Sequence, residues 1–349
     1  MNIKCYFLFA VVLLFVACEK KDKNITSPPK QEVRDSSIYV CGYERNEQGK
    51  LVAKYWKDGV PVLLTDGKNN AQANSIFVDG KDVYVCGVED SIASETLTFR
   101  NGRCWKNGVS IKFVDNSTSI IPEKIFVEGQ DIYVGATETS VIPGAGANTA
   151  VKYWKNGVPF VVSGTASFFT SLYVSKSNVY VSGNVASGTQ AAYWTNGNHF
   201  DLYRNIMYTT ALDVFASPSG NVYVCGATAN YWENFSRAVY WKDGVVNHLT
   251  DGPKSYQATS IAVFNDTVYT CGTEFGFGIS LARYWKNNTQ INLTDDSVSG
   301  TTSSIYVNKG IAYVAGTVGG TAVYWTDGKL TELTDGKRYA TATGIFVTY

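Results

Sequence analysis

The chain contains little histidine and no excess of charge of either sign. Only two histidines, His199 and His248, occur in 349 residues, so metal binding and acid–base catalysis lack their commonest side chain. Lys plus Arg and Asp plus Glu each total 30, which gives a formal net charge of zero. Because no basic stripe is present, the sequence has no electrostatic footprint for nucleic acid. We therefore expect no nucleic-acid partner, no bound metal and no cofactor.

Signature motifs of several enzyme classes are also missing. The sequence has no G-x-S-x-G, no phosphate-binding loop, no metal-binding His/Glu helix motif and no calcium-loop spacing. A recurrent L-T-D could suggest cation ligands, but an Asp at a strand end commonly forms hydrogen bonds within its own turn. We favour that structural role. The Asp residues of this motif are Asp66, Asp251, Asp295 and Asp335.

A repeat fills most of the chain. Each copy reads as a small polar run into I-x-V, then V-Y-V-C-G, then Y-W-K-D/N-G, then L-T-D-G, with 40 to 49 residues between successive tryptophans. Asp-Gly and Asn-Gly mark hairpin turns, so each copy supplies four short strands, A to D. Such a repeat predicts an all-β, seven-bladed β-propeller. The repeat tryptophans are Trp56, Trp105, Trp154, Trp194, Trp241, Trp285 and Trp325.

The two ends of the repeat region complement each other. The region opens at Ser37-Ile38-Tyr39-Val40, a strand B with no strand A before it, and it closes at Gly344-Ile345-Phe346-Val347, a strand A with no strand B after it. Four strands in every blade result only if the last strand joins the N-terminal strands B, C and D. We therefore expect one domain over residues 36–349 as a monomeric propeller, with its ring closed by the C-terminal strand.

The first 35 residues differ in character from the repeat. Lys4 precedes an apolar run too short to span a membrane, and the run ends in Phe15-Val16-Ala17-Cys18. This end resembles the lipobox of bacterial lipoproteins, although Phe15 stands where Leu is usual; a plain secretory signal is the alternative. The resemblance implies a signal peptide over residues 1–17, lipidation of Cys18 with membrane anchoring, and a flexible polar tether over residues 18–35. Glu19 after the cysteine favours the outer membrane.

Several repeat positions have a structural interpretation. Cys41, Cys86, Cys225 and Cys271 share one small-residue slot, and equivalent slots in different blades are too far apart for a disulfide. We expect these four and Cys104 to be buried free thiols. After strand B, a Glu occurs only in the blades that carry a Lys or Arg in strand C, which predicts cross-strand ion pairs. The predicted pairs are Glu44–Lys54, Glu89–Arg103, Glu138–Lys152 and Glu274–Arg283.

The candidate binding surface is the face that carries the B–C and D–A loops, because these loops vary in length and sequence while the other turns are uniform. The variable B–C loops are expected over 89–102, 139–149 and 230–236. Aromatic side chains on this face suit sugars or peptide side chains, although some of them could instead pack against the blade rims. The candidates are Tyr231, Trp232, Phe235, Phe275, Phe277, Phe168, Phe169, Tyr208, Tyr256 and Tyr339.

Residues 36–349 resemble uncharacterised Gram-negative bacterial lipoproteins with W-K-D/N-G repeat propellers, and the resemblance brings no established activity. The leading hypothesis is a non-enzymatic binding or scaffold module at the outer membrane, with a glycan or an envelope protein as ligand. The alternative is a propeller hydrolase or lyase acting on polysaccharide or peptidoglycan, for which Glu95, Asp213 and Glu233 are the nearest carboxylates. A third possibility is a subunit of a larger envelope complex.

Overall fold

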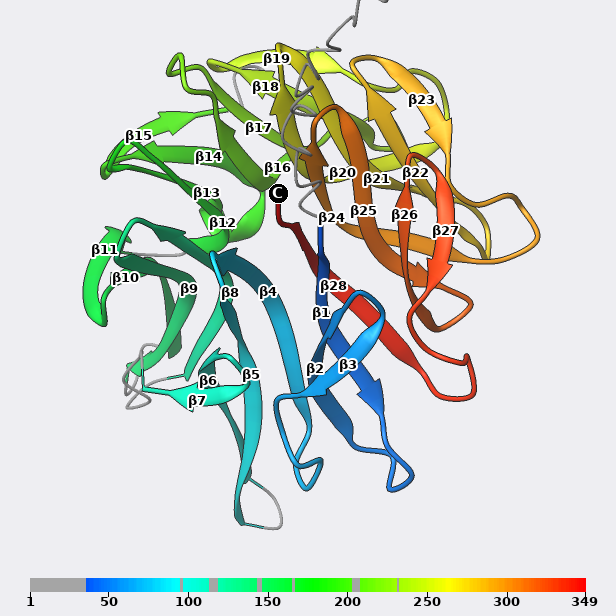
Figure 1. The fold of residues 1–349 in the computed structure, drawn as a ribbon. Helices are drawn as coiled ribbons and strands as arrows, with labels where there is room; N and C mark the ends of the chain where they lie inside the picture. Colours follow the sequence, from blue (N-terminus) through cyan, green and yellow to red (C-terminus); the bar gives the residue numbers. More distant parts are fainter. Residues whose placement is uncertain are drawn as a thin grey trace, which may run out of the picture. The chain divides into compact units, whose positions relative to one another are not determined.

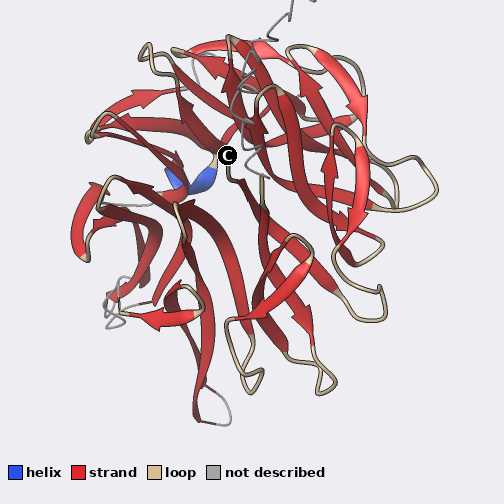
Figure 2. Cartoon of the chain, viewed as in Figure 1, coloured by secondary structure: helices blue, strands red, loops and turns tan. Residues whose placement is uncertain are grey.

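Seven four-stranded antiparallel sheets form a ring in the computed structural model, which describes residues 36–94, 97–112, 119–142, 146–164, 167–202, 208–230 and 232–349. The expected seven-bladed propeller is confirmed (Figure 1). Within the described ranges the single helical element is the 3-10 turn η1 (Ala186–Gly188) (Figure 2). No helix among them is long and apolar enough to span a bilayer.

Each blade contains strands A to D from the ring axis outward. Blade 1 is β28 (Ala340–Val347), β1 (Ile38–Arg45), β2 (Leu51–Lys57) and β3 (Val60–Leu63); blade 2 is β4 (Ala71–Asp79), β5 (Asp82–Ser94), β6 (Leu97–Lys106) and β7 (Val109–Ile111); blade 3 is β8 (Ser119–Glu128), β9 (Asp131–Ile142), β10 (Gly146–Lys155) and β11 (Val158–Ser163). Blade 4 is β12 (Phe168–Ser175), β13 (Asn178–Val185), β14 (Gln190–Thr195) and β15 (Asn198–Asp201); blade 5 is β16 (Tyr208–Ala216), β17 (Val222–Ala229), β18 (Arg237–Lys242) and β19 (Val245–His248). Blade 6 is β20 (Ser255–Phe264), β21 (Thr267–Phe275), β22 (Ser280–Lys286) and β23 (Thr289–Asn292); blade 7 is β24 (Gly300–Asn308), β25 (Ile311–Val318), β26 (Thr321–Thr326) and β27 (Lys329–Glu332).

The ring closes in blade 1, where β28 pairs with β1 over a register that includes Val40 opposite Ile345. Backbone hydrogen bonds continue to the very end of the pairing, since Thr348 N donates to Ser37 O at 3.0 Å. The C-terminus therefore lies near the middle of the ring (Figure 1). This clasp pairs the inner edge of β1 and gives blade 1 four strands like the other blades, as the sequence predicts.

The W-K-D/N-G motif builds the C–D turn and ties it to strand B. In every blade the Asp or Asn has a positive φ of 45 to 52°, and in six blades the next residue is a Gly with φ between 80 and 85°, as a type I′ turn requires. In each blade the Asp or Asn side-chain oxygen also accepts a hydrogen bond from the backbone at the start of strand B, for example from Ile38 N to Asp58 Oδ1 at 2.8 Å. The equivalent acceptors are Asn107, Asn156, Asn196, Asp243, Asn287 and Asp327.

The hydrophobic core lies between neighbouring blades. All seven repeat tryptophans are buried there, and each indole removes about 150–250 Å² from water. At about 25 cal/mol per Å², that burial corresponds to about 4–6 kcal/mol of transfer free energy per tryptophan. The prediction for the cysteines is confirmed within the described ranges, since Cys41, Cys86, Cys104, Cys225 and Cys271 are free and buried.

Two of the three predicted B–C loops are wrong in their extent. In blade 2, β5 and β6 continue as a paired hairpin through Ile92 opposite Thr98, and in blade 3, β9 and β10 pair as far as Ile142 opposite Gly146. Both segments lack a regular alternation of apolar and polar residues, so the sequence pattern gave no sign that the strands continue beyond the blade. The long hairpin of β5 and β6 projects from the ring in Figure 1.

Candidate functional site

We call the end of the ring that carries the A–B and C–D turns the turn face, and the opposite end, with the B–C and D–A loops, the loop face. Antiparallel pairing within each blade fixes this division. Both Ser37 and Thr348 lie at the turn face, where Ile38 N bonds to the C–D turn of blade 1.

The four predicted ion pairs are all present near the loop face. The carboxylates of Glu44 and Glu89 lie 2.5 and 3.0 Å from Lys54 Nζ and Arg103 Nε, and Glu138 pairs with Lys152. Glu274 is held by both Arg283, at 2.9 Å, and Lys254, at 2.5 Å. Burial alone would raise the pKa of Glu274, but these two cations outweigh it and lower that pKa. These carboxylates are therefore engaged in structural contacts.

Three of the four Asp residues of the L-T-D motif, all but Asp251, accept hydrogen bonds within their own turns. Asp66 Oδ1 accepts from Lys68 N at 3.1 Å, Asp295 Oδ1 accepts from Ser297 N at 2.9 Å, and Asp335 Oδ1 accepts from Lys337 N at 3.1 Å. Among the residues that the structure describes, no group of three His, Cys, Asp or Glu side chains is arranged to hold a metal ion.

Exposed aromatic side chains gather on the B–C loops of blades 5 and 6. Trp232, between β17 and β18, is 89% exposed, and Phe277, between β21 and β22, is fully exposed. The Trp232 loop is fixed by Arg237, whose guanidinium lies 4.8 Å from the Phe235 ring and donates to Glu233 at 2.7 Å. The four remaining exposed candidates on this face are each 39–47% exposed, namely Phe168, Tyr208, Phe275 and Tyr339.

Two predicted surface aromatics are instead part of the core. Phe169 is 2% exposed, and its ring fills the space left by Gly135 of the neighbouring blade, where a Cβ atom would lie 2.1 Å from Phe169 Cζ. Tyr256 is 8% exposed and meets Trp285 edge-on at a centroid distance of 6.4 Å. Tyr231 and Cys18 lie outside the described residues.

A polar groove of about 300 Å³ lies on the loop face between blades 1 and 2. Arg45, Lys50 and Arg100 line it together with Asn70 and Asp90. Asn70 bridges the two blades, because its Oδ1 accepts from Leu51 N at 3.1 Å and its amide donates to Asp90 at 3.4 Å. The groove thus offers both cationic and neutral hydrogen-bonding groups.

The axial channel is the feature that sequence reasoning missed. Every strand A contains a β-bulge at the same repeat position, and the bulged residues form one ring in the channel. They are Asn74, Glu123, Thr170, Leu212, Thr259, Ser303 and Thr343. The sequence does contain a signal for this ring, since the small polar residues before I-x-V suit a solvated channel. It does not show the bulge that turns these residues toward the axis.

Three ionisable side chains line the described part of the channel, namely Glu123, Lys124 and Asp213. Asp213 is buried and accepts four hydrogen bonds, from Ser171 Oγ at 2.5 Å, Ser260 Oγ at 2.6 Å, and the backbone N–H groups of Val214 and Ile261 at 3.0 and 3.1 Å. Lys124 Nζ lies 3.5 Å from Asp213 Oδ1. These two side chains border both a polar chamber of about 120 Å³ and an aromatic chamber of about 330 Å³.

Glu123 lines the polar chamber and has no hydrogen bond or ion pair among the described residues. Burial raises the pKa of this carboxyl to about 7. Of the carboxylates that the sequence suggested for catalysis, Asp213 is saturated with hydrogen bonds, Glu233 is paired with Arg237, and Glu95 lies outside the described residues. Glu123 is therefore the channel carboxyl with unused hydrogen-bonding capacity.

Comparison with known proteins adds fold relationships only. No family model and no curated protein matches the chain. Among solved structures, one from a study of two prolyl endopeptidases matches 90% of this chain at 13% identity with a TM-score of 0.51. The polysaccharide lyase Uly1 matches 89% of this chain and 87% of its own at 10% identity, with a TM-score of 0.49. This chain spans half the length of the prolyl endopeptidase chain.

Proposed function

We propose that the protein is a lipid-anchored envelope protein whose propeller binds a glycan through its loop face without transforming it. One observation carries this proposal: Trp232 and Phe277 are large apolar side chains exposed on B–C loops of adjacent blades. Aromatic rings stack on the apolar faces of sugars, and exposed apolar surface on the loops of a folded domain commonly marks a binding site. The polar groove between blades 1 and 2 adds hydrogen-bonding groups on the same face.

The membrane anchor in this proposal rests on the lipobox-like Phe15-Val16-Ala17-Cys18. Lipidation at Cys18 would hold the protein at the outer membrane through its acyl chains, with residues 18–35 as the tether. Globomycin-sensitive processing and incorporation of labelled palmitate, both abolished by Cys18→Ser, test this part independently of ligand binding. Processing that persists in the Cys18→Ser variant would contradict it.

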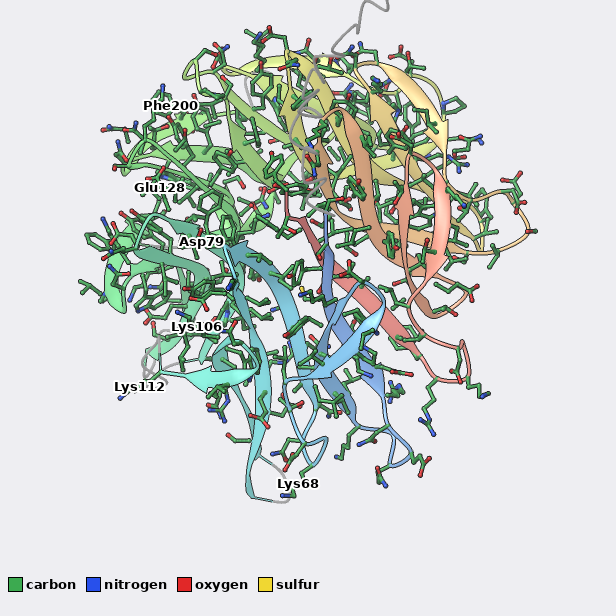
Figure 3. All side chains as sticks on the ribbon, in the orientation of Figure 1. Lys68, Asp79, Lys106, Lys112, Glu128 and Phe200 are labelled. Atoms are coloured by element: carbon green, nitrogen blue, oxygen red, sulfur yellow. The ribbon has the colours of Figure 1, made fainter. Side chains whose placement is uncertain are left out.

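A thermal-shift screen of the protein against envelope glycans, peptidoglycan fragments and peptides tests the binding function. A ligand at a hundred times its dissociation constant stabilises the folded state by about 2.7 kcal/mol. The double variant Trp232→Ala/Phe277→Ala should lose that stabilisation while retaining its own melting temperature. Phe200→Ala is the matched control, because Phe200 is 43% exposed but lies at the outer edge of the ring (Figure 3). If only peptides stabilise the protein in this screen, its ligand is a protein and not a glycan.

One observation favours a second candidate, a hydrolase or lyase acting on polysaccharide. Glu123 is an unpaired carboxyl in the channel with its pKa raised to about 7, a value suited to donating a proton near neutral pH. Incubation with polysaccharide and peptidoglycan substrates tests it. Turnover that is lost in Glu123→Gln supports catalysis, and turnover that survives this substitution excludes Glu123 as the proton donor.

A further inference from the structure

A ring of aromatic side chains surrounds the axis near the turn face. Each strand A contributes the middle residue of its I-x-V, and six of the seven are aromatic. Neighbouring rings touch in an unbroken series with centroid distances of 4.7 to 5.0 Å. In order around the axis they are Tyr306, Phe346, Phe77, Phe126, Tyr173 and Phe215. The chamber that they line has a volume of about 330 Å³, within the range of small-molecule sites.

The seventh position of this layer is Ala262, between Phe215 and Tyr306 in the order of the blades. Blade 6 therefore carries a methyl group where the other blades carry an aromatic ring, although Phe264 of the same strand also lines the chamber. The six contacting rings therefore form a layer that is interrupted at Ala262. A planar or branched apolar group could pack at this interruption and contact the flanking rings.

Polar groups occur at the inner end of the chamber. Asp213 has all its acceptor positions filled by two hydroxyls and two backbone N–H groups. Lys124, by contrast, carries three N–H donors, and it makes no hydrogen bond within the described part of the chain; its nearest charged partner is Asp213 Oδ1 at 3.5 Å. The Lys124 side chain is 29% exposed. Lys124 therefore presents N–H donors to the chamber that no described side chain takes up in a hydrogen bond.

We propose that the aromatic chamber binds a small carboxylate with an apolar body, its carboxylate directed to Lys124 and its body packed against the rings beside Ala262. This site lies at the opposite end of the channel from the loop-face aromatics and is independent of the proposed glycan binding. Aromatic rings also attract cations, but a cationic ligand would meet Lys124 at the inner end and find Asp213 already saturated. An anionic head group satisfies the unused donors and forms charge-assisted hydrogen bonds.

Calorimetric titration of the unmodified protein with three probes that share a phenylpropyl skeleton tests the assignment. The probes are 3-phenylpropanoate, 3-phenylpropanamide and 3-phenylpropan-1-amine. We expect the carboxylate to bind about tenfold or more tightly than the amide, because hydrogen bonds to a charged group are stronger than those to a neutral one. The amine should bind most weakly. Equal or tighter binding of the amine, or no binding of any probe at millimolar concentration, would overturn the proposal.

Two variants locate the site. Lys124→Met keeps an apolar stem but removes the N–H donors, so the affinity of the carboxylate probe should fall to that of the amide probe. Lys81 is an exposed turn-face lysine outside the chamber, so the control variant Lys81→Met should leave the affinity of every probe unchanged. Ala262→Phe completes the aromatic layer and should weaken all apolar probes, with Ala262→Leu as a smaller replacement if the first variant does not fold. A carboxylate preference that survives Lys124→Met, or binding unaffected by either substitution at Ala262, refutes the site.

Discussion

The largely buried carboxyl of Glu123 predicts that the stability of the protein depends on pH, which can be measured without knowing any ligand. Its carboxyl has a usual pKa of 4.5, and burial raises this pKa to about 7 in the folded protein. Between these two values the unfolded chain releases the proton while the folded chain keeps it. The free energy of unfolding therefore falls as pH rises from about 4.5 to 7. Each pKa unit corresponds to about 1.4 kcal/mol, and because Glu123 is partly exposed we expect a total of about 1–3 kcal/mol.

Glu123→Gln removes this titration, since the amide mimics the protonated form at every pH. The variant should match the unmodified protein near pH 4.5, apart from a constant offset, and exceed it by about 1–3 kcal/mol at pH 8. Urea unfolding followed by tryptophan fluorescence at several pH values measures the difference. Glu332→Gln is the control, because Glu332 is exposed on β27. A difference between Glu123→Gln and the unmodified protein that does not change with pH would refute the reasoning.

Three further predictions concern the scaffold. Deletion of residues 344–349 removes the C-terminal half of β28 and should lower the melting temperature by about 10 °C or more in one cooperative step. Unchanged melting would contradict the closure by β28. Glu274→Gln should lower the free energy of unfolding by about 3 kcal/mol or more, because it leaves Arg283 buried without its carboxylate. Glu89→Gln, at a more exposed pair, should lower it by less than about 1 kcal/mol. Equal losses for the two variants in chemical denaturation would count against this. Burial raises the pKa values of Cys41 and Cys104 to about 12, so neither thiol should react with iodoacetamide before the protein unfolds. Rapid labelling of the folded protein, detected by mass spectrometry, would show instead that these thiols are accessible.

The sequence was informative wherever seven copies could be compared. The repeat spacing, the Asp or Asn of the C–D turn and the incomplete blades at each end all follow from chemistry that is local to a few residues. The ion pairs could be predicted because glutamate and base occur in the same blades and are missing from the same blades. Glu274 and Arg283 are one such pair: both side chains are buried, and the Arg283 guanidinium donates a hydrogen bond to the Glu274 carboxylate.

The features that were missed depend on contacts between blades. Phe169 resembles a loop aromatic in sequence, and only the proximity of Gly135 in the adjacent blade explains its burial. The channel chemistry depends on bulges that turn Glu123 and its equivalents toward the axis. It also depends on a contact between Lys124 in blade 3 and Asp213 in blade 5. Neither a bulge nor an approach across the axis leaves a signature in hydrophobic periodicity, which reports only the alternation of faces along one strand.

The central proposal is that ligand is held on the loop face, and hydrogen–deuterium exchange with a bound glycan tests it most directly. The first glycan that stabilises the protein in the thermal screen would be added at saturation, and exchange would be followed by mass spectrometry. The account predicts slower exchange in the B–C loops at residues 230–236 and 276–279, with the turn face unchanged. Protection confined to the A–B and C–D turns, with these two loops unaffected, would contradict it.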